Sequence, residues 1–370
     1  MTALPRTRPP GEALRGADTP ADRVLARAAE HRVVMQAPKT VVAQGLMCGA
    51  RTLLAPADGA WLATTGYTDG TMTVRDPATG TPTCVLPGHA EWVSAEVGPA
   101  DGAWLATTGY TDGTVTVWDP STGTPTHTVS AHPQWVSAMV TPADGPWLAT
   151  TGNSDHTVTL WDPTTGTPIH TLSVPAHRVT AMVTPATGTW LAAGHVNGAL
   201  TVWHPDSGTA IDAASTSRMT AMGLPDNGGW LATGHVNGAL IIWDPATATA
   251  THTLSTGHVS AMVAPGDGTW LATSHLDGTL RIWDPATGIA THTLPGDPYE
   301  VTAMAVSPDG TWLGTSHLDG TVRVWDPGTM STLAALTVGT VLSQLSITEH
   351  ALTAIGEGRL FLVPLPQRHP

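Results

Sequence analysis

The chain has 370 residues, a formal net charge of -14 at pH 7 and only 12% charged residues. Its one lysine is Lys39, so no basic patch is available to neutralise phosphates, and this excludes nucleic acid as an expected partner. No run of 18 apolar residues occurs, and the first residues lack the apolar core of a signal peptide. We therefore expect no membrane insertion and predict a cytoplasmic location.

Two cysteines, Cys48 and Cys84, form neither a disulfide framework nor a metal-ligand spacing. We also expect no cofactor. Low lysine with abundant alanine, glycine, threonine and proline is typical of proteins from high-GC bacteria such as actinobacteria.

The N-terminal 30 residues differ in composition from the rest of the chain. Residues 1–16 are rich in proline, arginine and glycine, which predicts disorder. Thr19 and Pro20 can cap and start a helix that ends near Glu30. We predict an arm with a short helix over residues 1–30 and a repeat domain over residues 31–370. The helix packs on that domain or connects it to a partner.

A sequence of 40 to 43 residues then repeats along the chain, with Gly88–Val129 as its clearest copy. One marker is an aspartate or histidine that ends a strand-like run, at Asp76, Asp119, Asp162, His204, Asp244, Asp284 and Asp326. A second marker is a tryptophan followed by leucine, at Trp61, Trp104, Trp147, Trp190, Trp230, Trp270 and Trp312.

Each copy predicts four short strands separated by turns rich in glycine and aspartate. In Gly88–Val129 they cover Val93–Val97, Trp104–Gly109, Thr114–Trp118 and Pro125–Val129. The tryptophan before each second strand is expected to pack between neighbouring sheets.

The copies resemble the WD40 repeat family, in which GH…WD units fold as blades of a β-propeller. The resemblance covers Thr40–Pro364 and implies an all-β closed propeller of four-stranded antiparallel blades. Eight second strands are counted, but the eighth copy stops at Leu360–Pro364. An offset of 43 residues places Thr40–Gln44 in its missing outer-strand position, which predicts eight blades closed by an N-terminal strand. Seven blades with an appended hairpin are the alternative.

The resemblance also implies a buried network in each blade, linking a histidine, a serine or threonine, an aspartate and the signature tryptophan. Matching by spacing gives His89, Thr108, Asp112 and Trp118 in the second blade, and His132, Thr151, Asp155 and Trp161 in the third. Elsewhere the pattern decays, with Arg75 in the tryptophan position of the first blade and Ala193 and Asn197 in the fourth.

Two other series of positions differ from blade to blade. Before each innermost strand stand Trp92, Trp135, Arg178, Arg218, His258 and Glu300, which we expect on one rim around the channel mouth as partner-binding residues. Near the second turn stand Tyr67, Tyr110, Asn153, His195, His235, His275 and His317. Equivalent positions on packed sheets lie about 10 Å apart, too far for shared ligation of one ion, so no metal site is predicted.

No isolated catalytic constellation stands outside the repeats, and GxSxG, HExxH and a phosphate-binding loop are absent. We therefore predict a non-catalytic, monomeric scaffold that binds a protein partner on the rim, in signalling or complex assembly. The alternative is a lectin-like or small-ligand propeller that uses Tyr67, Tyr110 and the histidine series. A quinone-dependent dehydrogenase is disfavoured, because such enzymes are exported and use adjacent cysteines.

Overall fold

The computed structural model describes residues 53–54, 60–65, 71–76, 81–89, 93–109, 112–173, 178–213, 217–294, 299–307, 309–337, 341–342, 344–347, 351–356 and 359–364. All regular elements within these residues are β-strands. None of the residues searched forms a helix able to cross a membrane. The predicted arm over residues 1–30 and the predicted closing strand Thr40–Gln44 lie outside the described residues.

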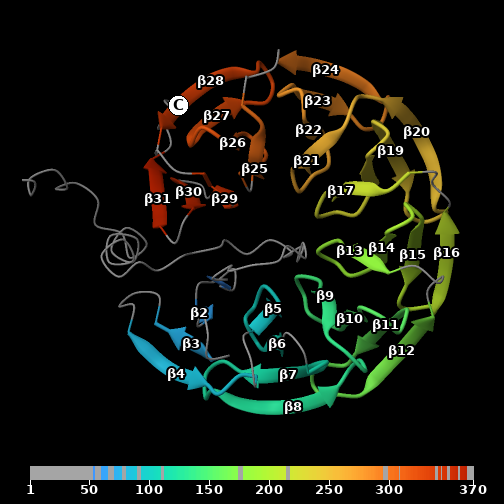
Figure 1. Cartoon of the computed structure of the whole chain (residues 1–370), viewed down its shortest axis with the longest axis vertical. Helices are drawn as coiled ribbons and strands as arrows, with labels where there is room; N and C mark the ends of the chain where they lie inside the picture. Colours follow the sequence, from blue (N-terminus) through green and yellow to red (C-terminus); the bar gives the residue numbers. More distant parts are fainter. Residues whose placement is uncertain are drawn as a thin grey trace, which may run out of the picture.

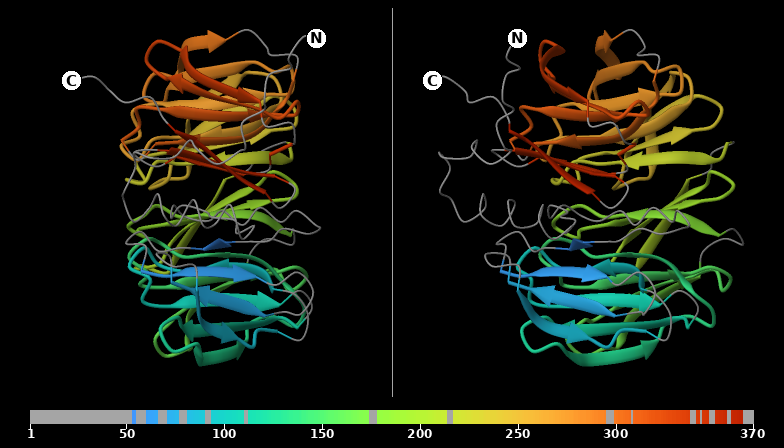
Figure 2. Two further views of the ribbon diagram at one scale, coloured as in Figure 1. Left: turned by 90° about the vertical axis from the view of Figure 1, so that its left-hand side faces the viewer. Right: turned by 60° about the vertical axis from the view of Figure 1, so that its left-hand side comes forward.

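The described strands form eight sheets, seven with four strands and one with three. Figure 1 shows these sheets arranged radially around a central axis, with β5, β9 and β13 near the centre and β8, β12 and β16 at the periphery. Seen from the side in Figure 2, many strands run across the thickness of the ring, whereas Figure 1 shows outer strands such as β8 and β20 lying along its circumference. The all-β propeller of antiparallel blades is confirmed, whereas an eighth complete blade closed by Thr40–Gln44 stays a prediction.

The first four sheets, called blades one to four below, have the following strands. Blade one contains β1 (Leu53–Leu54), β2 (Leu62–Thr65), β3 (Met72–Arg75) and β4 (Pro82–Leu86). Blade two contains β5 (Val93–Val97), β6 (Leu105–Gly109), β7 (Thr114–Asp119) and β8 (Thr124–Ser130). Blade three contains β9 (Val136–Val140), β10 (Leu148–Gly152), β11 (Thr157–Trp161) and β12 (Pro168–Ser173). Blade four contains β13 (Val179–Val183), β14 (Leu191–His195), β15 (Leu200–His204) and β16 (Thr209–Ala213).

The remaining blades follow the same order. Blade five contains β17 (Met219–Gly223), β18 (Leu231–His235), β19 (Ala239–Asp244) and β20 (Thr249–Ser255). Blade six contains β21 (Val259–Val263), β22 (Leu271–His275), β23 (Leu280–Asp284) and β24 (Ile289–Leu294). Blade seven contains β25 (Val301–Val306), β26 (Leu313–His317), β27 (Thr321–Asp326) and β28 (Ser331–Thr337). Sheet eight contains β29 (Gln344–Ile347), β30 (Ala351–Gly356) and β31 (Arg359–Pro364).

The hydrophobic cores lie between successive blades. Between blades two and three, for example, Val97 and Trp104 of one blade pack with Val136 and Met139 of the next. The methionine position of the innermost strand recurs as the buried side chains Met139, Met182, Met222 and Met262. Methionine adapts to irregular gaps, which suits the wedge-shaped space between radial sheets.

The second-strand tryptophans connect blades, as the sequence predicts. The indole N–H of Trp61 donates to the carbonyl of Gly102 in blade two at 3.0 Å. Trp190 and Trp230 make the same bond to the next blade at 3.1 Å. A buried indole needs an acceptor, and each of these tryptophans finds it across the interface.

The turns between the first and second strands add backbone hydrogen bonds from blade to blade. The Ala100 N–H donates to Ala143, Ala143 to Ala186, and Ala186 to Asp226, at 2.7, 2.9 and 3.1 Å. Because strands are antiparallel, these turns lie at one end of the ring, and the starts of the innermost strands lie at the other end. One end of the ring is therefore tied across four successive blades.

We predict that Trp190→Phe lowers the free energy of unfolding by about 1 kcal/mol, because it removes the hydrogen bond to Gly228 but keeps an aromatic ring. Trp190→Ala should cost about 3–5 kcal/mol, because it also leaves a cavity. Urea unfolding of both variants measures this difference. An unchanged free energy of unfolding in Trp190→Phe would show that the hydrogen bond contributes nothing beyond packing.

Candidate functional site

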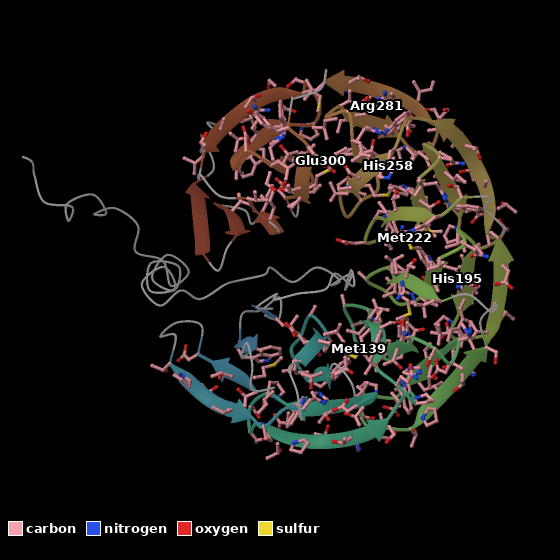
Figure 3. The ribbon with its side chains drawn as sticks, viewed as in Figure 1. Met139, His195, Met222, His258, Arg281 and Glu300 are labelled. Atoms are coloured by element: carbon pink, nitrogen blue, oxygen red, sulfur yellow. The ribbon has the colours of Figure 1, made fainter. Side chains whose placement is uncertain are left out.

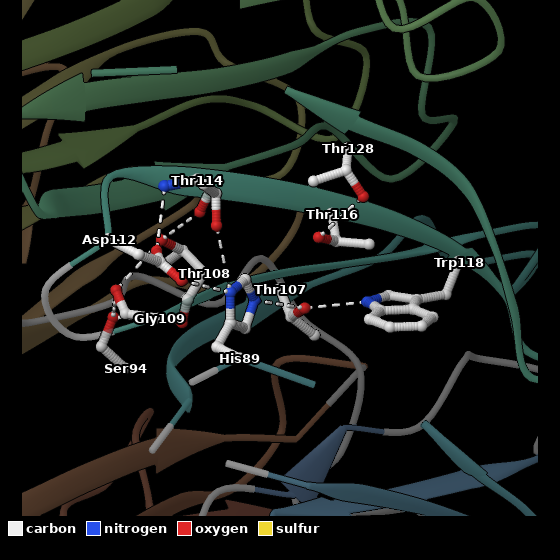
Figure 4. A network of polar contacts seen from close by, with 10 residues as sticks. All are labelled: His89, Ser94, Thr107, Thr108, Gly109, Asp112, Thr114, Thr116, Trp118 and Thr128. Atoms are coloured by element: carbon white, nitrogen blue, oxygen red, sulfur yellow. Dashed lines mark hydrogen bonds and ion pairs between the residues drawn. The ribbon is translucent and has the colours of Figure 1, made fainter. Parts of the chain in front are cut away.

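A buried polar network joins strands β6 and β7 of blade two to the loop before β5 and to the turn after β6 (Figure 4). The indole N–H of Trp118 on β7 donates to the hydroxyl of Thr107 on β6 at 2.8 Å. The same hydroxyl lies 3.0 Å from Nε2 of His89, whose Nδ1 lies 3.1 Å from Oδ2 of Asp112. The imidazole thus bridges the centre of the blade and the turn at its rim.

The hydrogen-bond partners define the tautomer of His89. An ionised carboxylate can only accept, so Nδ1 carries the proton and donates it to Asp112. In the neutral imidazole, Nε2 then accepts the hydroxyl proton of Thr107. Burial alone would raise the pKa of Asp112, but hydrogen bonds from Thr114 and the contact with His89 lower this pKa below its usual value. Asp112 therefore remains ionised at neutral pH and fixes the imidazole.

Blade three contains the same network, and in both blades the threonine differs from the predicted one. His132 contacts Asp155 at 2.6 Å, and its Nε2 contacts Thr150 at 2.9 Å. Trp161 also donates to Thr150, at 2.9 Å.

The predicted residues Thr108 and Thr151 bond elsewhere, to the backbone carbonyls of Thr114 and Thr157. Trp118 lies opposite Leu105 in the register, so its face of β6 carries alternate residues and includes Thr107 but not Thr108. In each blade the predicted threonine therefore follows the threonine of the network by one residue. The other predicted members, His89, Asp112 and Trp118 with their counterparts in blade three, take part in the network.

Blades five to seven build an equivalent network with a histidine at the end of the second strand. In blade five, Trp243 donates to Thr233 at 2.8 Å, and Thr233 contacts Nε2 of His235 at 2.9 Å. Nδ1 of His235 donates to the backbone carbonyl of Ser217, in the loop before β17, at 2.8 Å. His275 and His317 contact Thr273 and Thr315 in the same way, both at 3.0 Å.

Blade four has the histidine but lacks the threonine. Ala193 occupies the position of Thr107 and Thr233, and the indole N–H of buried Trp203 has no hydrogen-bond partner. His195 instead contacts Thr201 at 3.0 Å, and Thr201 donates to Asp212 at 2.6 Å. An unpaired buried donor costs about 1–3 kcal/mol, so blade four is a weak point of the ring.

The four histidines at the ends of the second strands in blades four to seven are buried structural residues. His195, His235, His275 and His317 are at most 3% exposed. Their burial rules out the predicted lectin-like alternative in which these side chains contact a sugar. Among the described residues, no cluster of histidine, cysteine, aspartate or glutamate could hold a metal ion. Tyr67 and Tyr110 lie outside the described residues.

The predicted rim residues occupy one equivalent position in successive blades. The backbone carbonyls of Trp135, Arg178, Arg218, His258 and Glu300 each accept an N–H from the turn after the second strand, at 2.9 to 3.2 Å. Arg178 and Arg218 are exposed, whereas Trp135, His258 and Glu300 are half-buried. Figure 3 labels His258 and Glu300 close to the innermost strands. Trp92 lies outside the described residues.

The side chain of Arg178 also reaches the neighbouring blade. One of its guanidinium nitrogens donates to Oδ1 of Asn153 in blade three at 3.3 Å. Side chains on this rim therefore meet across the boundary between blades three and four.

A surface hollow of about 480 Å³ lies between blades five and six. Trp230, Asp244, His252 and Asp284 are among the residues that line it. Each polar group is engaged: Trp230 donates to Gly268, His252 contacts the carbonyl of Ala286, and both aspartates accept hydrogen bonds from their own turns. The hollow thus contains no nucleophile paired with a free base.

Radial four-stranded blades with a tryptophan-centred polar network define a β-propeller of repeated units. The family model described as "WD domain, G-beta repeat" matches residues 80–119, 123–162, 166–204, 249–284 and 288–326, more than half of the chain. The chain therefore belongs to the WD40 repeat family. The propellers of this family generally serve as scaffolds for protein interactions. No match was found among curated proteins.

Solved structures support the fold. The computationally designed protein Ika8 is 20% identical, with a TM-score of 0.69 over 89% of this chain and 98% of its own. The C-terminal WD40 domain of Sif2 is 16% identical, with a TM-score of 0.69 over 90% of this chain and 99% of its own. Sqt1 of Saccharomyces cerevisiae is 14% identical, with a TM-score of 0.68 over 83% and 93%. Identities this low show a shared fold alone.

We predict that Ala193→Thr stabilises the protein by about 1 kcal/mol or more, because the new hydroxyl supplies the acceptor that Trp203 lacks. Ala193→Val is the matched control, since valine has the shape of threonine without its hydroxyl. Thermal and urea unfolding measure both variants. Equal stability of the two would mean that the orphaned indole N–H carries no cost.

Stability should also depend on pH near neutrality. Burial lowers the pKa of His235, His275 and His317 below the ordinary value. Below pH about 6.5 the unfolded chain takes up protons on these residues before the folded chain does, so stability falls as the pH falls. Above that pH the histidines are neutral in both states and stability no longer changes through them.

The unfolding midpoint of the native chain should therefore decrease from pH 7.5 to pH 5. A variant with His235→Gln, His275→Gln and His317→Gln should show a shallower slope. The control replaces His127, His170 and His292 of the outer strands with glutamine. The same slope in the buried-histidine variant and the native chain would contradict the assignment.

Proposed function

We propose that this WD40 propeller is a non-catalytic platform that binds a protein partner on the rim formed by Trp92, Trp135, Arg178, Arg218, His258 and Glu300. The proposal rests on one contrast. The backbone at these positions is held in the same way in successive blades, whereas the side chains differ in chemical type. Five of these positions share the same backbone hydrogen bond, yet their side chains are aromatic, basic, imidazole and acidic. Blade packing alone gives no reason for that variety.

The stiffness of the support favours this function. In blades three to seven, the residue before the innermost strand is anchored to the adjacent turn. In blades two and five, a buried imidazole links the rim to the centre of the blade. Side chains held in place lose little conformational entropy when a partner binds. Tryptophan and arginine are also the residues most enriched at binding hot spots.

The family supplies a general precedent for protein binding, but none of the similar structures names a partner for this chain. We further propose that the protein acts as a cytoplasmic monomer in signalling or complex assembly, as the sequence analysis predicts.

The test is affinity capture from native cytosol with the intact chain and a variant carrying Trp92→Ala, Trp135→Ala, Arg178→Ala and Arg218→Ala. A hot-spot side chain contributes about 2 kcal/mol or more, so binding of the partner should weaken about 30-fold or more. Because Arg178 and Arg218 are exposed but Trp135 is half-buried, thermal unfolding of the variant is measured beside that of the native chain to confirm that it is folded.

The matched control carries alanine at four outer-strand positions, Thr128, Ile169, Thr249 and Ile289, which are all exposed. Loss of a captured protein with the rim variant, and not with this control, would support the proposal. Undiminished capture by the rim variant would contradict the placement of the binding surface. Recovery of a glycan or metabolite in place of a protein would contradict the scaffold function.

A further inference from the structure

Four consecutive blades expose an aliphatic side chain at the same rim position. Val196, Val236, Leu276 and Leu318 are 39%, 47%, 53% and 48% exposed, and we call them the crescent. Each directly follows a buried histidine at the end of a second strand. Each also donates its backbone N–H to the rim residue of its own blade, Arg178, Arg218, His258 or Glu300. The crescent and the rim residues therefore lie side by side.

The fold does not require aliphatic residues at these positions. The turns are closed by their neighbours: Asn197 accepts the N–H of Ala199 at 3.0 Å, and Asp277 accepts that of Thr279 at 2.9 Å. In blade three the corresponding residue is Asn153, whose N–H donates to Trp135 in the same way. Neighbouring exposed apolar side chains that do not serve the core indicate a contact surface.

The charges beside the crescent change sign along it. Blades four and five carry the exposed Arg178 and Arg218, and the turn residues Asn197 and Asn237 are neutral. Blades six and seven carry three carboxylates, on Asp277, Asp319 and Glu300.

The arginines on the third strands of blades six and seven contact residues of their own blades. Arg281 donates to the carbonyl of Thr256 at 2.8 Å and lies over Trp283, with 6.0 Å between the guanidinium carbon and the ring centre. Arg323 lies over Trp325 in the same way. Figure 3 shows Arg281 farther from the central axis than His258 and Glu300.

These observations restrict the shape and charge of an occupant. Packed sheets lie about 10 Å apart, which is the length of about three extended residues. A chain that follows the curved rim in an extended polyproline II conformation, which has three residues per turn and rises about 3.1 Å per residue, can therefore place one apolar side chain on each blade if every third residue is apolar. A straight helix cannot follow the same arc.

We propose that the crescent binds an extended peptide segment of the partner, with an apolar residue at every third position. The acidic part of the segment lies beside Arg178 and Arg218, and its basic part lies beside Asp277, Asp319 and Glu300. This inference rests on the proposed function and assigns the partner's chemistry. It also extends the binding surface to blades six and seven.

The probe is a fluorescent synthetic peptide of about 12 residues, the extended length that spans four blades. It has leucine at every third position, glutamate in one half and lysine in the other, and is made in both chain directions. Two control peptides have the same composition, one with the leucines clustered at one end and one with the charges mixed. Fluorescence anisotropy with the full chain measures affinity.

At least one direction of the probe should bind the native chain, and about tenfold or more tightly than either control peptide. The variant Val196→Ser, Val236→Ser, Leu276→Ser and Leu318→Ser should lose about tenfold or more in affinity. A matched variant with serine at the exposed outer-strand residues Val85, Ile169, Ile289 and Leu333 should bind like the native chain. Thermal unfolding of both variants confirms that they are folded.

No binding of the probe in either direction would overturn the inference, and so would equal binding of the clustered or mixed-charge peptide. An equal loss in the two serine variants would overturn it as well. These failures are distinguishable from failure of the proposed function. If the rim variant of the preceding section still loses its captured protein, the scaffold stands and only the extended-peptide assignment falls.

Discussion

The hydrogen bond from a third-strand tryptophan to a second-strand threonine is the interaction on which each regular blade depends. It recurs in blades two, three, five, six and seven at 2.8 to 2.9 Å. The threonine hydroxyl is shared with an imidazole, so one buried oxygen connects the two middle strands of the blade to its rim. A buried indole or imidazole without a partner would cost free energy, so this arrangement also selects one register of the strands.

The histidine that contacts the threonine occupies one of two positions in the repeat, and the residues exposed on the rim differ between the two cases. In blades two and three it comes from the loop before the innermost strand and needs an aspartate in the turn. In blades five and seven it comes from the end of the second strand and bonds the backbone of that loop. The turn residue, Asn237 in blade five and Asp319 in blade seven, then accepts a hydrogen bond from its own turn, and the residue after the histidine is an exposed aliphatic side chain. The relocation of the histidine thus accompanies the appearance of the crescent.

Much of the fold could be predicted from the sequence, because each blade repeats the same local signals. The strands expected in Gly88–Val129 agree with β5 to β8 within one or two residues. The interblade role of the second-strand tryptophans followed from their recurrence once per blade. The rim positions could be aligned because they directly precede the innermost strands.

The sequence predicted the polar network less well, because hydrogen bonding depends on which face a side chain occupies. Thr108 was chosen by spacing, although alternation along β6 places Thr107 on the face of Trp118. The same alternation places residues 233 and 235 on one face of β18, so it could have predicted that His235 belongs to the network. The missing hydrogen-bond partner of the Trp203 indole N–H and the exposure of the crescent depend on three-dimensional contacts, which the repeat pattern does not show.

The threonine shared by the tryptophan and the histidine should hold the rim of its blade in place. Thr233→Val tests this support most directly, because valine keeps the shape of threonine and removes its hydroxyl. Hydrogen exchange of the native chain and this variant, followed by mass spectrometry, locates the effect. We expect faster exchange in residues 217–220 and 236–239 of blade five, with exchange in β20 unchanged. Unchanged exchange in both rim segments would contradict it, because the rim would then hold its shape without the network.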